Sequence, residues 1–302
     1  MCKKYEFTGE TLEWEGHVLK RIRALRKIGI VKPGDLGGWV EKEENLSHEE
    51  ECWIHGDAKV YGDAVVSEYA QITGQAIICE CASVCGNARV RDNAKVADKA
   101  KISEDAQVFG NADINGQASI CGDAVVCEKA QVSGEATILD EAKINGQAYI
   151  GEFAVICDCA KVYGEAKVYG NAEVCGMSCI YDRAEVRGNT VRIGGNAHVF
   201  EDAVVTKCAS VSGNVKIFGH SAVTGMARIC ENAKIYGNAF VGEKAKVFGN
   251  AEICDNAKLS GQVHVGFHAK VYGSTEMSGY PIGCELEGLK SPMQEVNKLS
   301  AF

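Results

Sequence analysis

A repeat of six residues is the feature that most constrains this chain. From Glu51 to Gly279 the sequence divides into 38 six-residue units, with one extra residue in the segment 189–195. The fourth position is Val or Ile in 36 of the 38 units, and the second position is Ala in 31 of them. Gly, Glu or Asp usually closes a unit, and Asn or Asp often opens the next one. Self-similarity at a short, fixed period is typical of solenoids, so we expect one structural unit stacked many times.

The period of six indicates short strands rather than helices, because a helix of 3.6 residues per turn would spread residues six apart around its whole surface. The large aliphatic residue is expected to fill a core, the Ala to fit a tight corner, and the Gly to supply a permissive backbone there. Three sides make a triangular coil of 18 residues, and stacked coils pair through backbone hydrogen bonds. The absence of proline between residues 34 and 280 agrees with such ladders. The sequence therefore predicts an all-β parallel β-helix of about 12–13 coils.

This hexad resembles the hexapeptide-repeat family. The segment "LKRIRALRKIGIVKPGDLGGWVEKEENLSHEEECWIHGDAKVYG" (Leu19–Gly62) is similar to the start of the YdcK-type hexapeptide-repeat proteins of bacteria and phages, which are usually described as acyltransferase-like. The resemblance implies a left-handed parallel β-helix, and the handedness comes from the resemblance alone. It also implies a homo-oligomer, with a trimer of parallel axes favoured.

The two ends of the chain leave the repeat. Residues 1–50 alternate like strands, contain Trp14 and Trp39, and are expected to form a small β cap over the first coil, with a turn at Thr8–Gly9. Trp53 in the first unit is expected to anchor this cap. Residues 51–279 form the predicted β-helix, and residues 280–302 form a tail or a second cap.

Composition limits the classes of function. The formal net charge of −9 argues against general nucleic-acid binding, which needs a basic surface. We expect no membrane association and a cytoplasmic location, because the sequence has no apolar leader and no apolar run of about 18 residues. The 15 cysteines are interpreted as reduced thiols that act as small apolar residues. The spacings of Cys79/Cys81 and Cys157/Cys159 differ from the zinc-binding CxxC pair, so no metal site is expected.

Positions three and five of each unit are expected to point outward, and residues 18 apart to stack on one face. In the C-terminal half, one face aligns aromatic side chains at position five with mostly basic ones at position three. Three interpretations stay open: ladders of like side chains within a sheet, a subunit interface, and a ligand groove in which rings stack on a base and lysines receive phosphate charge. The lysines also have a simpler interpretation, in which their stems only cover the sheet. The predicted ligand-binding or interface residues are Lys161, Tyr163, Tyr181, His198, Phe200, Lys216, Phe218, Lys234, Tyr236, Lys270 and Tyr272.

A second face carries small residues at position five and is expected to be flat. They are Ser67, Cys85, Ser103, Cys121, Leu139, Cys157, Cys175, Gly194, Ser212 and Cys230. The single irregularity, Asn189–Gly195, is predicted to form a local bulge and the edge of a site.

Catalysis is the less favoured prediction. The family resemblance implies a histidine base in a cleft between subunits, a long loop that shapes this cleft, and an acyl-CoA substrate. The repeat has no such loop, and we find no nucleotide-binding or hydrolase motif. The candidate bases are His198, His220, His264 and His268.

The favoured function is a non-catalytic homo-oligomer without a cofactor that binds a small anionic ligand on its side faces or between subunits. In one version, the ligand is a nucleotide signal sequestered as a phage counter-defence. The alternatives are an acyltransferase that uses acetyl-CoA or another acyl-CoA, and a structural rod or scaffold.

Overall fold

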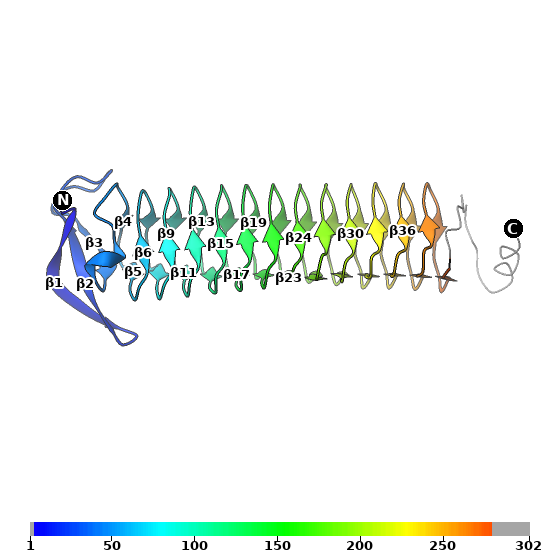
Figure 1. Ribbon diagram of the computed structural model, residues 1–302, viewed down its shortest axis with the longest axis horizontal. Helices are drawn as coiled ribbons and strands as arrows, with labels where there is room; N and C mark the ends of the chain where they lie inside the picture. Colours follow the sequence, from blue (N-terminus) through cyan, green and yellow to red (C-terminus); the bar gives the residue numbers. More distant parts are fainter. Residues whose placement is uncertain (1–2, 280–302) are drawn as a thin grey trace, which may run out of the picture. The chain divides into compact units, whose positions relative to one another are not determined.

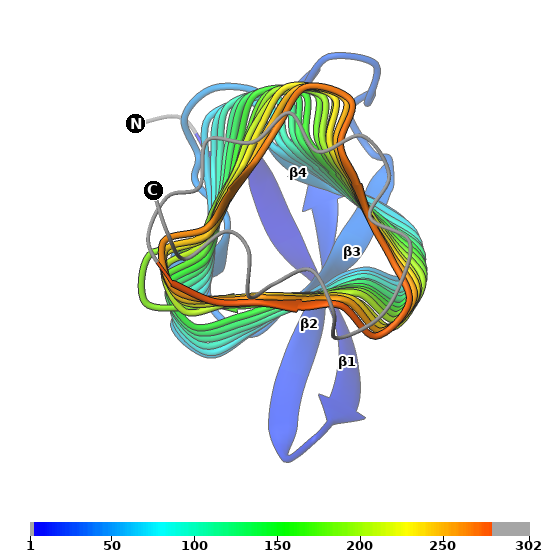
Figure 2. The same ribbon diagram turned by 90° about the vertical axis from the view of Figure 1, so that its right-hand side faces the viewer.

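The repeat folds as predicted, into coils of short parallel strands. The computed structural model describes residues 3–279, so the predicted tail, residues 280–302, lies outside the described residues. The chain forms two compact units, the first ending at Asp158 and the second beginning at Cys159. Figure 1 shows the short strands that repeat from coil to coil within each unit. Both are parallel β-solenoids with three sheets, and together they hold about 13 turns of about 18 residues. Seen along its axis, each unit has coils that trace a triangle (Figure 2).

In the first unit the three sheets take every third strand. One sheet contains β3 (Leu36–Val40), β5 (Lys59–Val60), β8 (Ile77–Ile78), β11 (Lys95–Val96), β14 (Asp113–Ile114), β17 (Gln131–Val132) and β20 (Tyr149–Ile150). The next contains β4 (Trp53–Ile54), β7 (Gln71–Ile72), β10 (Arg89–Val90), β13 (Gln107–Val108), β16 (Val125–Val126) and β19 (Lys143–Ile144). The third contains β6 (Val65–Val66), β9 (Ser83–Val84), β12 (Lys101–Ile102), β15 (Ser119–Ile120), β18 (Thr137–Ile138) and β21 (Val155–Ile156).

The second unit repeats this order. One sheet contains β23 (Lys167–Gly170), β26 (Glu185–Gly188), β29 (Val204–Thr206), β32 (Ala222–Val223), β35 (Phe240–Val241), β38 (Lys258–Leu259) and β41 (Glu276–Met277). The next contains β22 (Lys161–Val162), β25 (Cys179–Ile180), β28 (His198–Val199), β31 (Lys216–Ile217), β34 (Lys234–Ile235), β37 (Glu252–Ile253) and β40 (Lys270–Val271). The third contains β24 (Glu173–Val174), β27 (Arg192–Ile193), β30 (Ser210–Val211), β33 (Arg228–Ile229), β36 (Lys246–Val247) and β39 (His264–Val265).

The core follows the hexad. Positions two and four point inward, as Ala106 and Val108 do, and both of these side chains are fully buried. Position three, the first residue of most strands, lies outside, as Gln107 does. Partners 18 residues apart pair in register, for example Gln107 with Val125 and Val108 with Val126. This register places identical hexad positions one above another in each unit.

The corners explain why acidic residues alternate with glycine at the sixth position. These residues have a positive φ, which favours glycine; a Cβ added at Gly86 would lie 2.5 Å from the backbone nitrogen of Glu104. Glu104 itself has φ 59°, and its carboxylate accepts the backbone N–H of Gly122 at 2.7 Å. The carboxylate therefore links its own corner to the equivalent corner of the next coil. The same contact is made by Glu68, Glu80, Asp92, Asp98, Glu128, Asp140, Asp182, Glu201, Glu231, Glu243 and Asp255.

The N-terminal cap is a β-hairpin, as predicted, but its turn lies elsewhere. β1 (Tyr5–Trp14) runs straight through Thr8–Gly9, where the pairing with β2 (His17–Ala24) shifts between Phe7 and Thr11. The predicted turn at Thr8–Gly9 is therefore wrong, because Gly9, at φ 90°, accommodates a β-bulge. The turn is Glu15–Gly16, where both φ values are positive, as a two-residue hairpin loop requires. The hairpin projects beyond the triangle of coils (Figure 2).

Close backbone approach seats the cap on the first coil. A Cβ at Gly37 would lie 2.7 Å from the Trp53 ring, and one at Gly38 would lie 2.3 Å from the Ile54 side chain. Trp53 is buried, which confirms its predicted anchoring role, and the Tyr5 ring meets it edge-on at 6.4 Å. A short 3-10 helix, η1 (Glu43–Asn45), follows β3. Within residues 3–279, no helix has the length and apolar character needed to span a membrane.

Candidate functional site

Five aromatic residues of the second unit form one continuous stack. We call the outer face of the sheet formed by β22, β25, β28, β31, β34, β37 and β40 the ring face. Each of the five rings follows its strand directly, at position five of the hexad. Neighbouring ring centroids lie 4.9, 4.9, 4.9 and 5.0 Å apart, with interplanar angles of 2°, 1°, 6° and 6°. The stacked rings are Tyr163, Tyr181, Phe200, Phe218 and Tyr236.

The stack leaves little room for a flat ligand. Each inner ring already has a neighbouring ring against both of its faces, so a base could stack only at an end of the row. Burial raises the pKa of Tyr181 to about 12, and the neighbouring Tyr163 and Asp182 add to the shift, so the hydroxyl stays protonated at neutral pH. Tyr272, predicted as part of the same column, is separated from Tyr236 by the buried side chain of Cys254. The rings of the stack therefore contact one another and need no ligand between them.

The lysines of the ring face divide into two groups. Lys234 and Lys270 both contact the carboxylate of Glu252, with N–O distances of 3.0 and 3.2 Å. The hydrogen bond from Lys234 is the largest cause that lowers the pKa of Glu252, and Lys270 adds to it. Among the residues that the structure describes, Lys161 and Lys216 form no ion pair. Two of the four predicted lysines are thus paired with a carboxylate on the same sheet.

The four candidate histidines are not brought together. His198 is half-buried on the ring face, 6.2 Å edge-on from the Tyr181 ring, and burial is the first cause that lowers its pKa. His220 lies at an exposed corner, 3.6 Å from an Asp202 carboxylate that Arg183 already holds at 2.7 and 2.8 Å. The other two, His264 on β39 and the exposed corner residue His268, lie on or beside a different sheet.

A depression lies on the neighbouring sheet, formed by β24, β27, β30, β33, β36 and β39, whose outer face we call the cation face. The depression has a volume of about 630 Å³ and covers strands β27, β30, β33 and β36. Position five is small here, at Ser212 and Cys230, but the face is hollowed rather than flat as expected, because the longer side chains at neighbouring positions surround these small ones. Its lining comprises Thr190, Arg192, Cys208, Ser210, Ser212, Met226, Arg228, Ile229, Cys230 and Lys246. A second depression of about 820 Å³ shares Cys208 and Met226 with it.

Strand register places the cations of this depression in a row. Arg192 pairs with Ser210, Ser210 with Arg228, and Arg228 with Lys246. Neighbouring strands lie about 4.8 Å apart, so the Arg228 and Lys246 side chains start side by side. Arg192 contacts the carboxylate of Glu173 at 3.2 Å. Within residues 3–279, neither Arg228 nor Lys246 forms an ion pair, and the Lys246 amine lies 5.2 Å from the Phe248 ring centroid.

The irregular segment borders this depression. Thr190 and Arg192 belong to the predicted bulge Asn189–Gly195, and both line the hollow. The backbone N–H of Thr190 bonds to the carbonyl of Lys207 at 3.2 Å. Sequence reasoning missed Arg192, Ser210, Arg228 and Lys246, because this face was read at position five only. Reading its third position at the same interval of 18 would have revealed the row.

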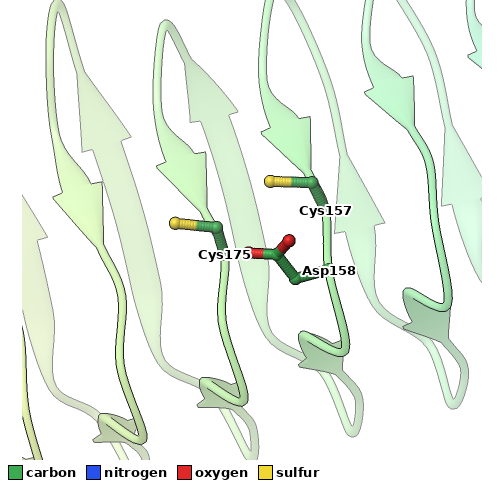
Figure 3. A group of neighbouring side chains, drawn as sticks. All are labelled: Cys157, Asp158 and Cys175. Carbon is green, nitrogen blue, oxygen red and sulfur yellow. The ribbon is translucent and has the colours of Figure 1, made fainter.

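Among residues 3–279 no cysteine forms a disulfide, and most of these cysteines lie on the outer faces or at corners, whereas Cys52 is fully buried at an inward position. Cys157 and Asp158 end the first unit directly after β21, and Cys175 follows β24 in the second unit (Figure 3). Burial is the first cause that raises the pKa of the Cys230 thiol, and nearby Glu231 adds to it, whereas Lys246 opposes it. Cys230 is therefore a thiol rather than a thiolate at neutral pH. The expected lack of a metal site stays a prediction.

Comparison of the sequence with known proteins identifies no relative. No protein-family model matches the chain, and no curated protein matches it.

Proposed function

We propose that this protein binds a small anionic ligand in the depression of the cation face. The observation that carries the proposal is the adjacency of Arg228 and Lys246 on paired strands, with no carboxylate from residues 3–279 in an ion pair with either. Like charges directly opposite each other on a sheet repel and destabilise it. An anion between them removes this repulsion, whereas on the ring face Glu252 already does so for Lys234 and Lys270.

The lining fits a ligand that carries phosphate. Arginine and lysine make short, charge-assisted hydrogen bonds to phosphate oxygens, and Arg228 can donate two in parallel. The hydroxyls of Thr190, Ser210 and Ser212 add neutral donors around the cations. The volume of about 630 Å³ exceeds what a single phosphate needs and lies in the range of small-molecule sites. Met226 adds an apolar wall, so a nucleotide is the first ligand class to test.

Binding without catalysis is the form of the proposal that the histidines support. His198 and His264 lie on strands of two different sheets, and His220 and His268 lie at corners, so the four candidate bases do not share one strand or one corner. The proposal also takes the chain as a hexapeptide-repeat protein that forms homo-oligomers, with a trimer favoured. Support for that part is the resemblance of Leu19–Gly62 together with the triangular coils.

Isothermal titration of the purified protein against AMP, a cyclic mononucleotide, a cyclic dinucleotide and inorganic phosphate tests the binding. At least one nucleotide should bind more tightly than inorganic phosphate, and heating the complex should release it unchanged. Failure of every compound to bind would refute the proposal, and recovery of a chemically altered ligand would favour an enzyme. Acetyl-CoA with a panel of amines provides the matched assay for acyl transfer, read as thiol release. Native mass spectrometry of the same sample reports the number of subunits.

A further inference from the structure

The cap contains a buried amine in contact with a buried thiol. Lys4 precedes β1, Cys52 precedes β4, and both side chains are fully buried. The Lys4 Nζ lies 3.1 Å from the Cys52 Sγ. Its other hydrogen bonds go to the carbonyls of Cys52, at 2.9 Å, and Glu49, at 3.2 Å. No carboxylate from residues 3–279 forms an ion pair with Lys4, so its charge has only neutral partners.

Burial changes the chemistry of both groups. It is the first cause that lowers the pKa of Lys4, and it is also the first that raises the pKa of the Cys52 thiol. Burial of an ammonium among neutral acceptors favours release of its proton, and a neutral amine has the free electron pair that a covalent bond needs. The pair is thus a primary amine and a thiol held in contact and shielded from solvent.

Cys52 stands at a hexad position that does not require a thiol. It is the second residue of the first hexad, and 31 of the 38 units carry Ala there. Ala58 and Ala64, the second residues of the next two hexads, are fully buried in the same inward orientation. Packing alone would accept Ala at position 52, so the sulfur and its contact with Lys4 need a separate explanation.

We propose that Lys4 and Cys52 are a site of oxidative cross-linking, in which one oxygen atom bridges Nζ and Sγ. The oxidant is molecular oxygen. One N–H bond of the neutral amine and the S–H bond break, N–O and O–S bonds form, and the second oxygen atom leaves as water with the two hydrogens. The separation of 3.1 Å between Nζ and Sγ exceeds both a direct N–S bond and the span of a bent N–O–S link, but it is nearer to the span of the link. Insertion of oxygen therefore moves the two buried atoms less than direct joining would.

The bridge would fasten the first strand of the cap to the start of the repeat. Tyr5 and η1 pack around the same place, with the Tyr5 hydroxyl donating to the carbonyl of Glu43 at 2.9 Å. A covalent link across 48 residues restricts the unfolded chain and resists local opening of the hairpin. A thiol reductant would open the link by cleaving the O–S bond. Two reductant thiols become a disulfide, the Cys52 thiol is regenerated, and the oxygen stays on the Lys4 Nζ as a hydroxyl group.

Peptide mass spectrometry of the full chain tests this proposal. After incubation in air-saturated buffer, the peptides of Lys4 and Cys52 should appear linked, with a mass one oxygen higher and two hydrogens lower than their sum. Trypsin should no longer cleave after Lys4, and dithiothreitol should separate the peptides, leaving an unmodified Cys52 peptide and a Lys4 peptide heavier by one oxygen. Cys52→Ala, which matches the other hexads, is the control that should fold and show no link. Hydrogen exchange in β1 and β2 of the linked protein should be at least about tenfold slower than in that variant.

Three results would overturn the proposal. Separate peptides with an unmodified Cys52 would show that the pair does not react. Oxygen on Cys52 without a link to Lys4 would show ordinary thiol oxidation. A link without the added oxygen would exclude the bridge chemistry. Cys79, a buried thiol elsewhere in the first unit, is the internal control and should stay unlinked in the same digest.

Discussion

The ring face and the cation face of the second unit are built on the same strand spacing but satisfy their side chains in different ways. On the ring face, Phe200 has Tyr181 on one side and Phe218 on the other, both at 4.9 Å. On the cation face, Arg228 has Ser210 and Lys246 as its strand neighbours and no ion pair among residues 3–279. Stacking identical positions at about 4.8 Å suits aromatic rings and is unfavourable for like charges.

This difference suggests that one face contributes to the stability of the fold and the other to ligand binding. A row whose members satisfy one another needs no ligand, even where it is half-exposed. A row whose members repel one another gains free energy from an added anion. The most conspicuous column of the sequence, the aromatic one, is therefore expected to hold the fold together, and the less conspicuous cation row to bind the ligand.

The largest expected effect is on ligand affinity. Replacing both Arg228 and Lys246 with Ala should weaken binding of the best nucleotide at least about 100-fold, because each charge-assisted contact contributes about 1.5–3 kcal/mol and about 1.4 kcal/mol is tenfold. Isothermal titration measures the loss. The matched control is the double variant Lys234→Ala/Lys270→Ala on the ring face, which should bind within about threefold of the parent. An equal loss of ligand affinity in the two double variants would refute the proposed difference between the faces.

The next effect is on stability. Phe200→Ala removes two stacked contacts, each worth about 0.5–1.5 kcal/mol beyond the buried area, and should lower the free energy of unfolding by about 2–3 kcal/mol. Chemical denaturation measures this change, and ligand affinity should stay the same. Ser212→Ala, at position five of the cation face, should cost less than about 0.5 kcal/mol. A Phe200→Ala protein as stable as the Ser212→Ala protein would show that the stack contributes nothing.

The smallest effect depends on pH. The carboxylate of Glu252, whose pKa is lowered by Lys234 and then Lys270, stabilises the fold above its ordinary pKa of 4.5, and this contribution disappears as pH falls through the lowered value. Glu252→Gln should therefore cost about 0.5–1 kcal/mol at pH 7 and less than that near pH 3. Denaturation at both pH values gives the comparison. A cost that is unchanged at pH 3 would mean that the carboxylate charge is not its cause.

The sequence predicted the fold because the hexad fixes both burial and register. Ala106 and Val108 could be placed inside, and Tyr181 over Tyr163, from spacing alone. The hairpin turn was misplaced because a bulge and a turn both use glycine, and only the pairing of Trp14 with His17 distinguishes Gly16 from Gly9.

The candidate site was less predictable than the fold. Spacing places Glu252 between Lys234 and Lys270, but it does not say that the one carboxylate contacts both amines. The depression depends on small side chains such as Ser212 next to Arg228, and on Thr190 from the irregular segment. A hollow of this kind depends on the side-chain volumes of neighbours on four successive coils, which one column of residues 18 apart does not reveal.

The hydrogen bonds made by the acidic corner residues all point the same way along the chain. In every such contact the carboxylate belongs to the earlier coil and the N–H to the one that follows, as with Glu68 and Gly86 or Glu231 and Gly249. Because synthesis runs from the N-terminus, each folded coil presents its corner carboxylate as an acceptor to residues that leave the ribosome later. The protein can be completed in the order in which it is translated, each turn serving as the template for the next.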